Sequence, residues 1–101
     1  MRPFAEFIRE RRIAKGLLLR EVAAKLEIDP SLLSRIERGD KRPTRQQVLQ
    51  LASILKVNEN EFLVHYLSDR VVYELKDEKL AMKAMEAAER KITYLRKKGK
   101  S

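Results

Sequence analysis

The stretch of sequence that decides the fold is LREVAAKLEIDPSLLSRIER, residues 19–38. Its apolar residues repeat at three- and four-residue spacing on both sides of the short segment 27–29, which is the pattern of two amphipathic helices. Asp29 followed by Pro30 predicts the N-cap and the first residue of the second helix. Ala23 is small enough to allow a close approach between the two helices. The sequence therefore predicts a pair of helices joined by a tight turn.

Further helices are predicted on both sides of this pair. Pro3 opens a helix that runs to about Lys15, and Gly16 ends it. The segment Thr44–Gln47 has the spacing of a capping box, so another helix begins at about Arg45.

Asn58 repeats the capping-box spacing and predicts a fifth helix. The helix places four apolar or aromatic residues toward the core, namely Phe62, Leu63, Tyr66 and Leu67. It continues through Val71 and Leu75, because no helix-breaking residue intervenes.

The last part of the chain predicts one additional helix, with Asp77 as its cap. Its apolar residues follow alternating four- and three-residue steps, a heptad-like stripe formed by Ala81, Met85, Ala88, Ile92 and Leu95. One helix cannot bury this stripe alone. We therefore expect the segment from Leu75 to Leu95 either to dock on the preceding helix or to pair with its copy in a second chain.

The predicted fold is all-α, a bundle of five helices with an additional C-terminal helix. The domain organisation expected from these elements is a bundle over residues 1–67 and a C-terminal extension over residues 68–101, which ends in a basic tail. The chain of 101 residues is 44% hydrophobic and 38% charged, so it can bury one core and stay soluble.

Composition excludes several classes of protein. The chain has no cysteine, which excludes disulfides, zinc fingers and thiol chemistry. Its apolar runs are too short to cross a membrane, and its N-terminus lacks the pattern of a signal peptide. We therefore expect a cytoplasmic protein.

The distribution of charge favours a polyanionic partner. The net charge is +8, and residues 1–45 carry 12 basic and 7 acidic groups while residues 76–101 carry 9 and 4. The segment between them carries 2 basic and 4 acidic groups. Nucleic acid fits this pattern better than an anionic membrane surface. The alternative is that the basic surface serves solubility alone.

The helix that starts at Pro30 is the best candidate for contact with DNA. In a pair of helices of this kind the second helix lies in the major groove with its N-terminal half on the base edges. The positions that point outward on that half are predicted to be Pro30, Ser31, Leu32 and Arg35. Arg20 lies near the start of the preceding helix, where a phosphate would pass.

At this point a family resemblance is evident. The stretch from Phe7 to Phe62 resembles the Cro and phage-repressor (Xre-type) helix-turn-helix family. The matching elements are Ile8-Arg9 with Arg12, Lys15-Gly16-Leu17, Glu21-Val22-Ala23, the run from Leu33 to Gly39, Arg42-Pro43, and the apolar block from Leu51 to Leu63. The run Ser34–Gly39 is the most specific part.

The resemblance implies a lambda-repressor-like bundle that binds double-stranded DNA as a homodimer across a palindromic site. By position, Ser31 and Arg35 would face bases. Ser34 and Arg38 would lie near phosphates, and the loop Lys41-Arg42 would contact the DNA backbone. Arg12 and Glu37 correspond to the family's internal ion pair, which has a structural role.

The sequence departs from the family pattern at three positions. Leu18 and Leu19 stand where the family has a Ser or Thr cap followed by a Gln that contacts DNA. Glu27 stands where the turn often has glycine, and a positive φ there costs about 1 kcal/mol. The family's DNA contacts from the second helix are therefore not carried over.

Two other functions remain open at this stage. One is a helical adaptor that uses Leu18 and Leu19 as a protein contact, and the other is a targeting subunit that binds a protein partner through the C-terminal helix. The residues indicate no enzyme, cofactor or metal site: His65 is the single imidazole, has no acidic cluster near it, and is expected to pack in the core or face water.

Overall fold

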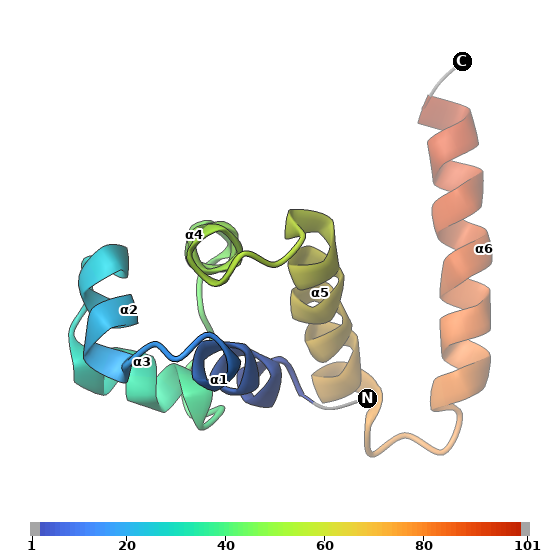
Figure 1. The fold of residues 1–101 in the computed structure, drawn as a ribbon. Coiled ribbons are helices and arrows are strands. Elements are labelled where there is room, and N and C mark those ends of the chain that lie inside the picture. Colours follow the sequence, from blue (N-terminus) through green and yellow to red (C-terminus); the bar gives the residue numbers. More distant parts are fainter. Residues whose placement is uncertain (1–2, 100–101) are drawn as a thin grey trace. The chain divides into compact units, whose positions relative to one another are not determined.

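The computed structural model describes residues 3–99, and the described residues form six α-helices and no strand. In chain order these are α1 (Phe4–Ala14), α2 (Leu19–Leu26), α3 (Pro30–Glu37), α4 (Arg45–Leu55), α5 (Glu59–Leu75) and α6 (Ala81–Gly99) (Figure 1). The all-α prediction is confirmed. The chain forms two compact units, Met1–Arg70 and Val71–Ser101, and each is described by itself.

Side-chain caps fix the starts of α4 and α5 at the predicted places. The Oγ1 of Thr44 accepts a hydrogen bond from the Gln47 amide at 3.1 Å, and the Gln47 side chain accepts one from the Thr44 amide at 2.9 Å. The Oδ1 of Asn58 accepts from the Glu61 amide at 3.1 Å. These bonds satisfy amide groups that have no partner inside the helix.

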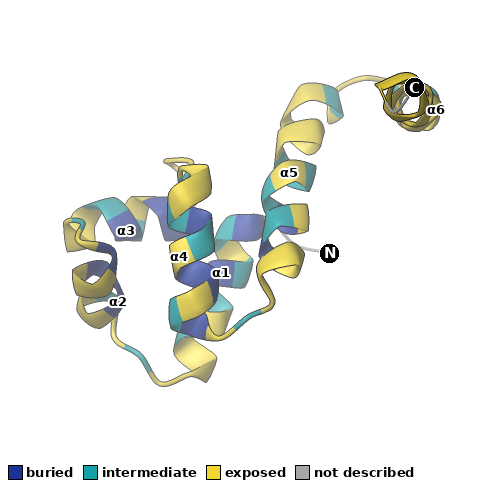
Figure 2. Ribbon diagram, turned by 90° about the horizontal axis from the view of Figure 1, so that it is seen from above, coloured by how far each residue is buried: buried dark blue, intermediate teal, exposed yellow. Residues whose placement is uncertain are grey.

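The core of the first unit consists of the apolar faces of α1 to α5. Figure 2 colours the buried positions dark blue, and they lie on the sides of the helices that face one another. The buried apolar residues are Phe4, Ile8, Val22, Ala23, Leu26, Leu33, Ile36, Val48, Leu51, Ala52, Leu55 and Phe62. Because α3 contributes Leu33 and Ile36, its orientation is fixed by the same core that holds α1 and α4.

An aromatic cluster joins α1 to α5. The ring of Phe4 meets that of Phe62 edge-on at 5.1 Å, and the Phe7 ring stacks on the His65 imidazole at 4.4 Å. His65 is buried, so the packing alternative for this residue is correct. The Asp69 carboxylate accepts a hydrogen bond from the Phe4 amide at 3.0 Å, so α5 supplies the cap that Pro3 cannot give to α1.

Two predictions about the later helices are wrong. Leu67 is 42% exposed instead of buried, because it lies five residues after Phe62 and therefore about 140° around the helix from the inward face. Asp77 does not cap α6. The amide of Glu78 bonds the Leu75 carbonyl at 2.9 Å and the amide of Ala81 bonds the Glu78 carbonyl at 3.2 Å, so these residues form turns and the helix begins at Ala81.

Candidate nucleic-acid interface

The turn between α2 and α3 is closed by backbone hydrogen bonds. Glu27 ends α2 in the left-handed conformation, with φ 58° and ψ 42°. The Ile28 amide then reaches back to the Ala23 carbonyl at 3.0 Å. Ala23 is fully buried at the contact between the two helices, as its small side chain predicts. The positive φ at Glu27 carries the cost of about 1 kcal/mol expected for a residue with a Cβ.

Helix α3 has one anchored face and one exposed face. Leu33, Ile36 and Glu37 are buried, whereas Pro30, Ser31 and Arg35 are exposed. The outward position predicted for Leu32 is only partly correct, because this side chain is half-buried and packs against the core. Ser34 is also half-buried. The exposed face therefore carries a short polar surface at the start of the helix and an arginine one turn further on.

The Asp29 carboxylate organises the start of α3. Its Oδ1 accepts hydrogen bonds from both the amide and the hydroxyl of Ser31, each at 2.8 Å. These two bonds lower the pKa of Asp29 below its ordinary value of 3.8, with the backbone bond the larger cause. Because the Ser31 hydroxyl hydrogen is engaged, the Ser31 oxygen can form a further hydrogen bond only as an acceptor.

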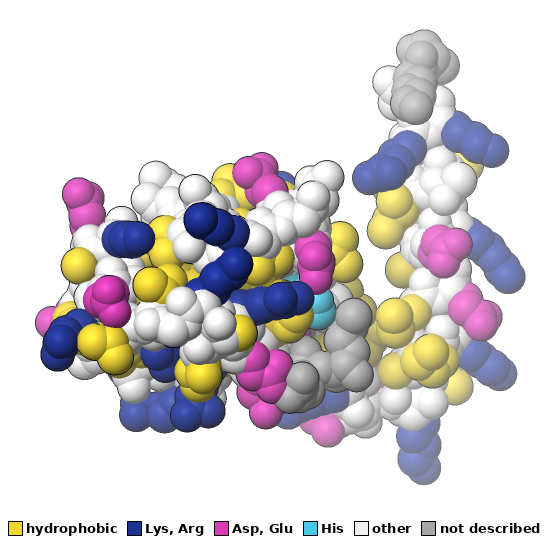
Figure 3. Space-filling model, in the orientation of Figure 1, with side chains coloured by type: hydrophobic (Ala, Val, Ile, Leu, Met, Phe, Trp, Pro, Cys, Tyr) yellow, Lys and Arg dark blue, Asp and Glu magenta, His cyan; other side chains and the backbone are white. Residues whose placement is uncertain are grey.

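Basic side chains continue beyond the end of α3. Arg38 is exposed and its Nε donates to the Asp40 carboxylate at 3.2 Å, a surface ion pair worth less than about 1 kcal/mol. Lys41 and Arg42 follow in an exposed loop. Figure 3 shows Lys and Arg side chains gathered along the lower edge of the first unit, on the side where Figure 1 places α3.

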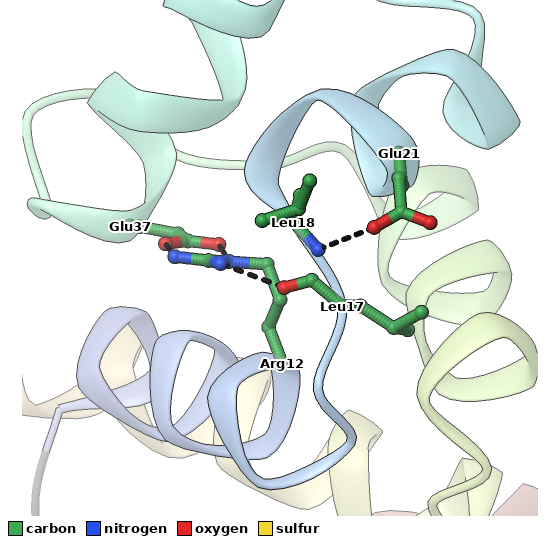
Figure 4. A network of polar contacts seen from close by, with 5 residues as sticks. All are labelled: Arg12, Leu17, Leu18, Glu21 and Glu37. Atoms are coloured by element: carbon green, nitrogen blue, oxygen red, sulfur yellow. Dashed lines mark hydrogen bonds and ion pairs between the residues drawn. The ribbon is translucent and has the colours of Figure 1, made fainter.

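A buried ion pair fixes α3 to the first helix (Figure 4). The Arg12 guanidinium donates two hydrogen bonds to the Glu37 carboxylate, from Nε at 2.8 Å and from Nη2 at 3.0 Å. Its Nη1 donates to the Leu17 carbonyl at 2.9 Å. The side chains of Arg12 and Glu37 are 13% and 4% exposed. One guanidinium thus joins α1, the loop before α2 and the end of α3 in a planar, two-bond geometry.

The start of α2 has an incomplete cap. Leu18 offers no acceptor from its side chain, but the Glu21 carboxylate accepts from the Leu18 amide at 2.9 Å. The Leu18 side chain is half exposed, whereas Leu19 packs against the core. Arg20 is exposed in the first turn of the helix. Of the two leucines, only Leu18 therefore presents substantial apolar surface.

The second unit contains the residues predicted for dimerisation or docking. Leu75 and Ala81 are half-buried, while Met85, Ala88, Ile92 and Leu95 are exposed. Among residues 3–99, no group of three or more His, Cys, Asp and Glu side chains could hold a metal ion. No helix in the same range has the length and apolar character to cross a membrane.

Two contacts of this site were missed by the sequence reasoning. The hydroxyl bond from Ser31 to Asp29 has a local signal, since an Asp two residues before a Ser forms such side-chain turns. The contact of Asp69 with the Phe4 amide has none, because the two residues are 65 positions apart.

The first of the two helices, α2, packs against the bundle, a tight turn follows it, and the second helix, α3, exposes a polar face. This arrangement defines a helix-turn-helix protein. Residues 3–63, more than half of the chain, match the family described as "Helix-turn-helix domain". The chain belongs to this family.

The solved structures include a similar fold. The crystal structure of the clp gene regulator ClgR from Corynebacterium glutamicum superposes with a TM-score of 0.58 at 22% sequence identity, covering 92% of this chain and 85% of that one. At this identity the likeness establishes the shared fold. No curated protein matches the sequence.

Proposed function

We propose that this chain is a sequence-specific double-stranded DNA-binding transcription regulator of the Xre type, acting as a homodimeric repressor or autoregulator. The observation that carries the proposal is the division of α3 into two faces. Leu33, Ile36 and Glu37 hold one face, and the other presents Ser31 and Arg35 to solvent. A helix held in this way can enter the major groove without a rearrangement of the bundle.

The chemistry of the exposed face suggests a role for each residue. Arg35 suits a two-bond contact with guanine O6 and N7. Ser31 suits an amino group of adenine or cytosine, because its hydroxyl hydrogen is engaged by Asp29. Pro30 and the exposed part of Leu32 offer apolar contacts for a thymine methyl group.

Phosphate contacts are assigned to side chains around this helix. Arg38 exchanges its weak surface pair with Asp40 for a phosphate, and Ser34 lies on the preceding turn. The remaining proposed phosphate contacts are Arg20, Lys41 and Arg42. Since each neutralised phosphate releases counterions, affinity falls steeply as salt rises. In a dimer, the two copies of α3 occupy successive major grooves about 34 Å apart on a palindromic site.

Selection of bound duplexes from a random pool tests the proposal. The full chain is expected to enrich a palindromic sequence. Arg35→Ala is expected to weaken binding to that sequence by about 1–3 kcal/mol and to relax one or two base positions. Lys41→Ala is expected to weaken binding to all sequences alike. It is also expected to reduce the slope of the logarithm of affinity against the logarithm of salt concentration by about 1. Lys25→Ala, the same charge change outside the proposed contacts, serves as the control.

The proposal fails if the full chain enriches no sequence at low salt. The assignment of Arg35 fails if Arg35→Ala selects the same sequence with unchanged affinity.

A further inference from the structure

Helix α6 exposes an apolar stripe along its whole length. None of the residues of α6, all within the described range, is buried. Met85 is 43% exposed, Ile92 52% and Leu95 63%. The stripe residues recur at the alternating four- and three-residue steps that keep one seam facing a partner helix. The stripe therefore has the geometry of a helix–helix interface.

Side-chain size alternates over the first four residues of this stripe, and the large Leu95 follows Ile92. Ala81 and Ala88 occupy one set of seam positions, and the larger Met85 and Ile92 occupy the other. In a parallel pair of α6 helices each layer would contain two copies of one residue, so methionine would face methionine and alanine would face alanine. The two alanine layers would be under-filled. In an antiparallel pair the layers built from these four residues can each combine one large and one small side chain.

We infer that α6 pairs in antiparallel orientation with α6 of a second copy of this chain. In the register that matches large with small at these four positions, Met85 faces Ala88 of the second copy and Ile92 faces its Ala81. Leu95 lies opposite residue 78, before the start of the second copy's α6. The two-fold axis passes between residues 86 and 87. The inference rests on the proposed function, because it supplies the interface of the proposed dimer.

The charge of α6 supports the same orientation. The first half of the helix, residues 81–89, contains Lys83, Glu86 and Glu89, a net charge of −1. The second half, residues 90–99, has no acidic residue and carries a net charge of +5 from Arg90, Lys91, Arg96, Lys97 and Lys98. A parallel pair would place the two strongly basic halves side by side. In the antiparallel register the two α6 helices overlap over residues 81–92, so the Arg96, Lys97 and Lys98 side chains of the two copies lie at opposite ends of the pair. This arrangement also opposes the two helix dipoles.

Positions that flank the seam agree with this register. In a parallel pair Lys91 would lie beside Arg96 of the second copy, which is a like-charge contact. In the antiparallel register Lys91 lies beside Ala84 of the second copy, and Glu89 lies beside its Met82. The antiparallel arrangement therefore removes the like-charge contact at the edge of the seam.

Distance measurement between spin labels tests the orientation. The chain has no cysteine, so Lys97→Cys introduces a single label site per copy on the outer face of α6. With a rise of about 1.5 Å per residue, the antiparallel register separates the two labels by about 30–40 Å. A parallel pair would bring them within about 10–20 Å. Glu86→Cys is the control, because it lies near the two-fold axis and gives a short distance in either orientation.

Disruption of the seam tests whether α6 forms the dimer. Ile92→Glu is expected to convert the full chain from dimer to monomer in sedimentation velocity. Thr93→Glu places the same side chain one residue away, off the seam, and is expected to leave the dimer intact. A short Lys97→Cys distance overturns the inference, as does a wild-type monomer or an Ile92→Glu variant that remains a dimer.

The two proposals can fail separately. If the labels report the long distance but the chain enriches no duplex, the proposed function fails and the α6 pair stands. If Ile92→Glu still binds the selected palindrome as a dimer, the α6 pair is wrong and the proposed function stands.

Discussion

The two units of the chain use the same residue types but differ in what their apolar side chains contact. In the first unit the stripes of five helices meet, and Phe62, Leu51 and Leu33 lose all contact with water. In the second unit the stripe of α6 has no buried residue, although its apolar spacing is equally regular. Regular spacing thus predicts a helix and its apolar face, whereas burial depends on a second surface of matching shape.

The largest expected effect sharpens this contrast. Phe62→Ala is expected to lower the free energy of unfolding by about 3–5 kcal/mol, because it removes a fully buried ring that contacts Phe4 and Phe7. Tyr94→Ala removes an aromatic ring that is 62% exposed and lies off the α6 stripe. That change is expected to stay within about 0.5 kcal/mol. Urea unfolding followed by circular dichroism measures both, and equal losses would contradict the division into a packed and an open unit.

The second prediction concerns the polar link inside the first unit. Arg12→Ala leaves the buried Glu37 carboxylate without its partner and is expected to destabilise the protein by about 3–5 kcal/mol. The double variant Arg12→Met with Glu37→Leu replaces both charges by apolar groups and is expected to recover most of that loss. Thermal unfolding of the three proteins provides the comparison. If the double variant were as unstable as Arg12→Ala, the loss would come from packing or from the Leu17 contact instead of the unpaired carboxylate.

Most of the first unit could be predicted from local sequence, because its signals act over a few residues. The caps at Asp29, Thr44 and Asn58 lie where side-chain chemistry places them. The buried faces of α3 and α4 follow from apolar spacing. The error at Leu67 arises because this residue lies about 140° around α5 from Phe62, outside the face that packs against the bundle.

Other features lie beyond what local sequence can report. The contact between Asp69 and the Phe4 amide joins residues whose proximity depends on the whole bundle. The turns before Ala81 compete with a helix that Asp77 could have capped, and the backbone bonds at Leu75 and Glu78 favour the turns. For the candidate site, spacing identified which side of α3 faces outward. The engagement of the Ser31 hydroxyl by Asp29, which leaves the Ser31 oxygen as an acceptor, was not predicted although the spacing of the two residues is a local signal for it.

The smallest expected effect is a pH dependence at the start of α3. The pKa of Asp29 is lowered in the folded protein by its bonds to Ser31, so the ionised carboxylate stabilises the fold. This contribution is fully present above the ordinary value of 3.8 and is lost as the pH falls through the lowered folded-state pKa. Asp29→Asn keeps a side chain suited to the N-cap but cannot titrate there.

The difference in melting temperature between wild type and Asp29→Asn isolates this contribution. It is expected to be constant at neutral pH and to shift in favour of the asparagine variant only at pH values below 3.8. Ser31→Ala removes the hydroxyl bond but keeps the backbone bond, which is the larger cause of the shift, so it is expected to reduce the pH dependence without abolishing it. If Ser31→Ala abolished the pH dependence, the Ser31 hydroxyl and not its amide would be the main cause of the lowered pKa of Asp29.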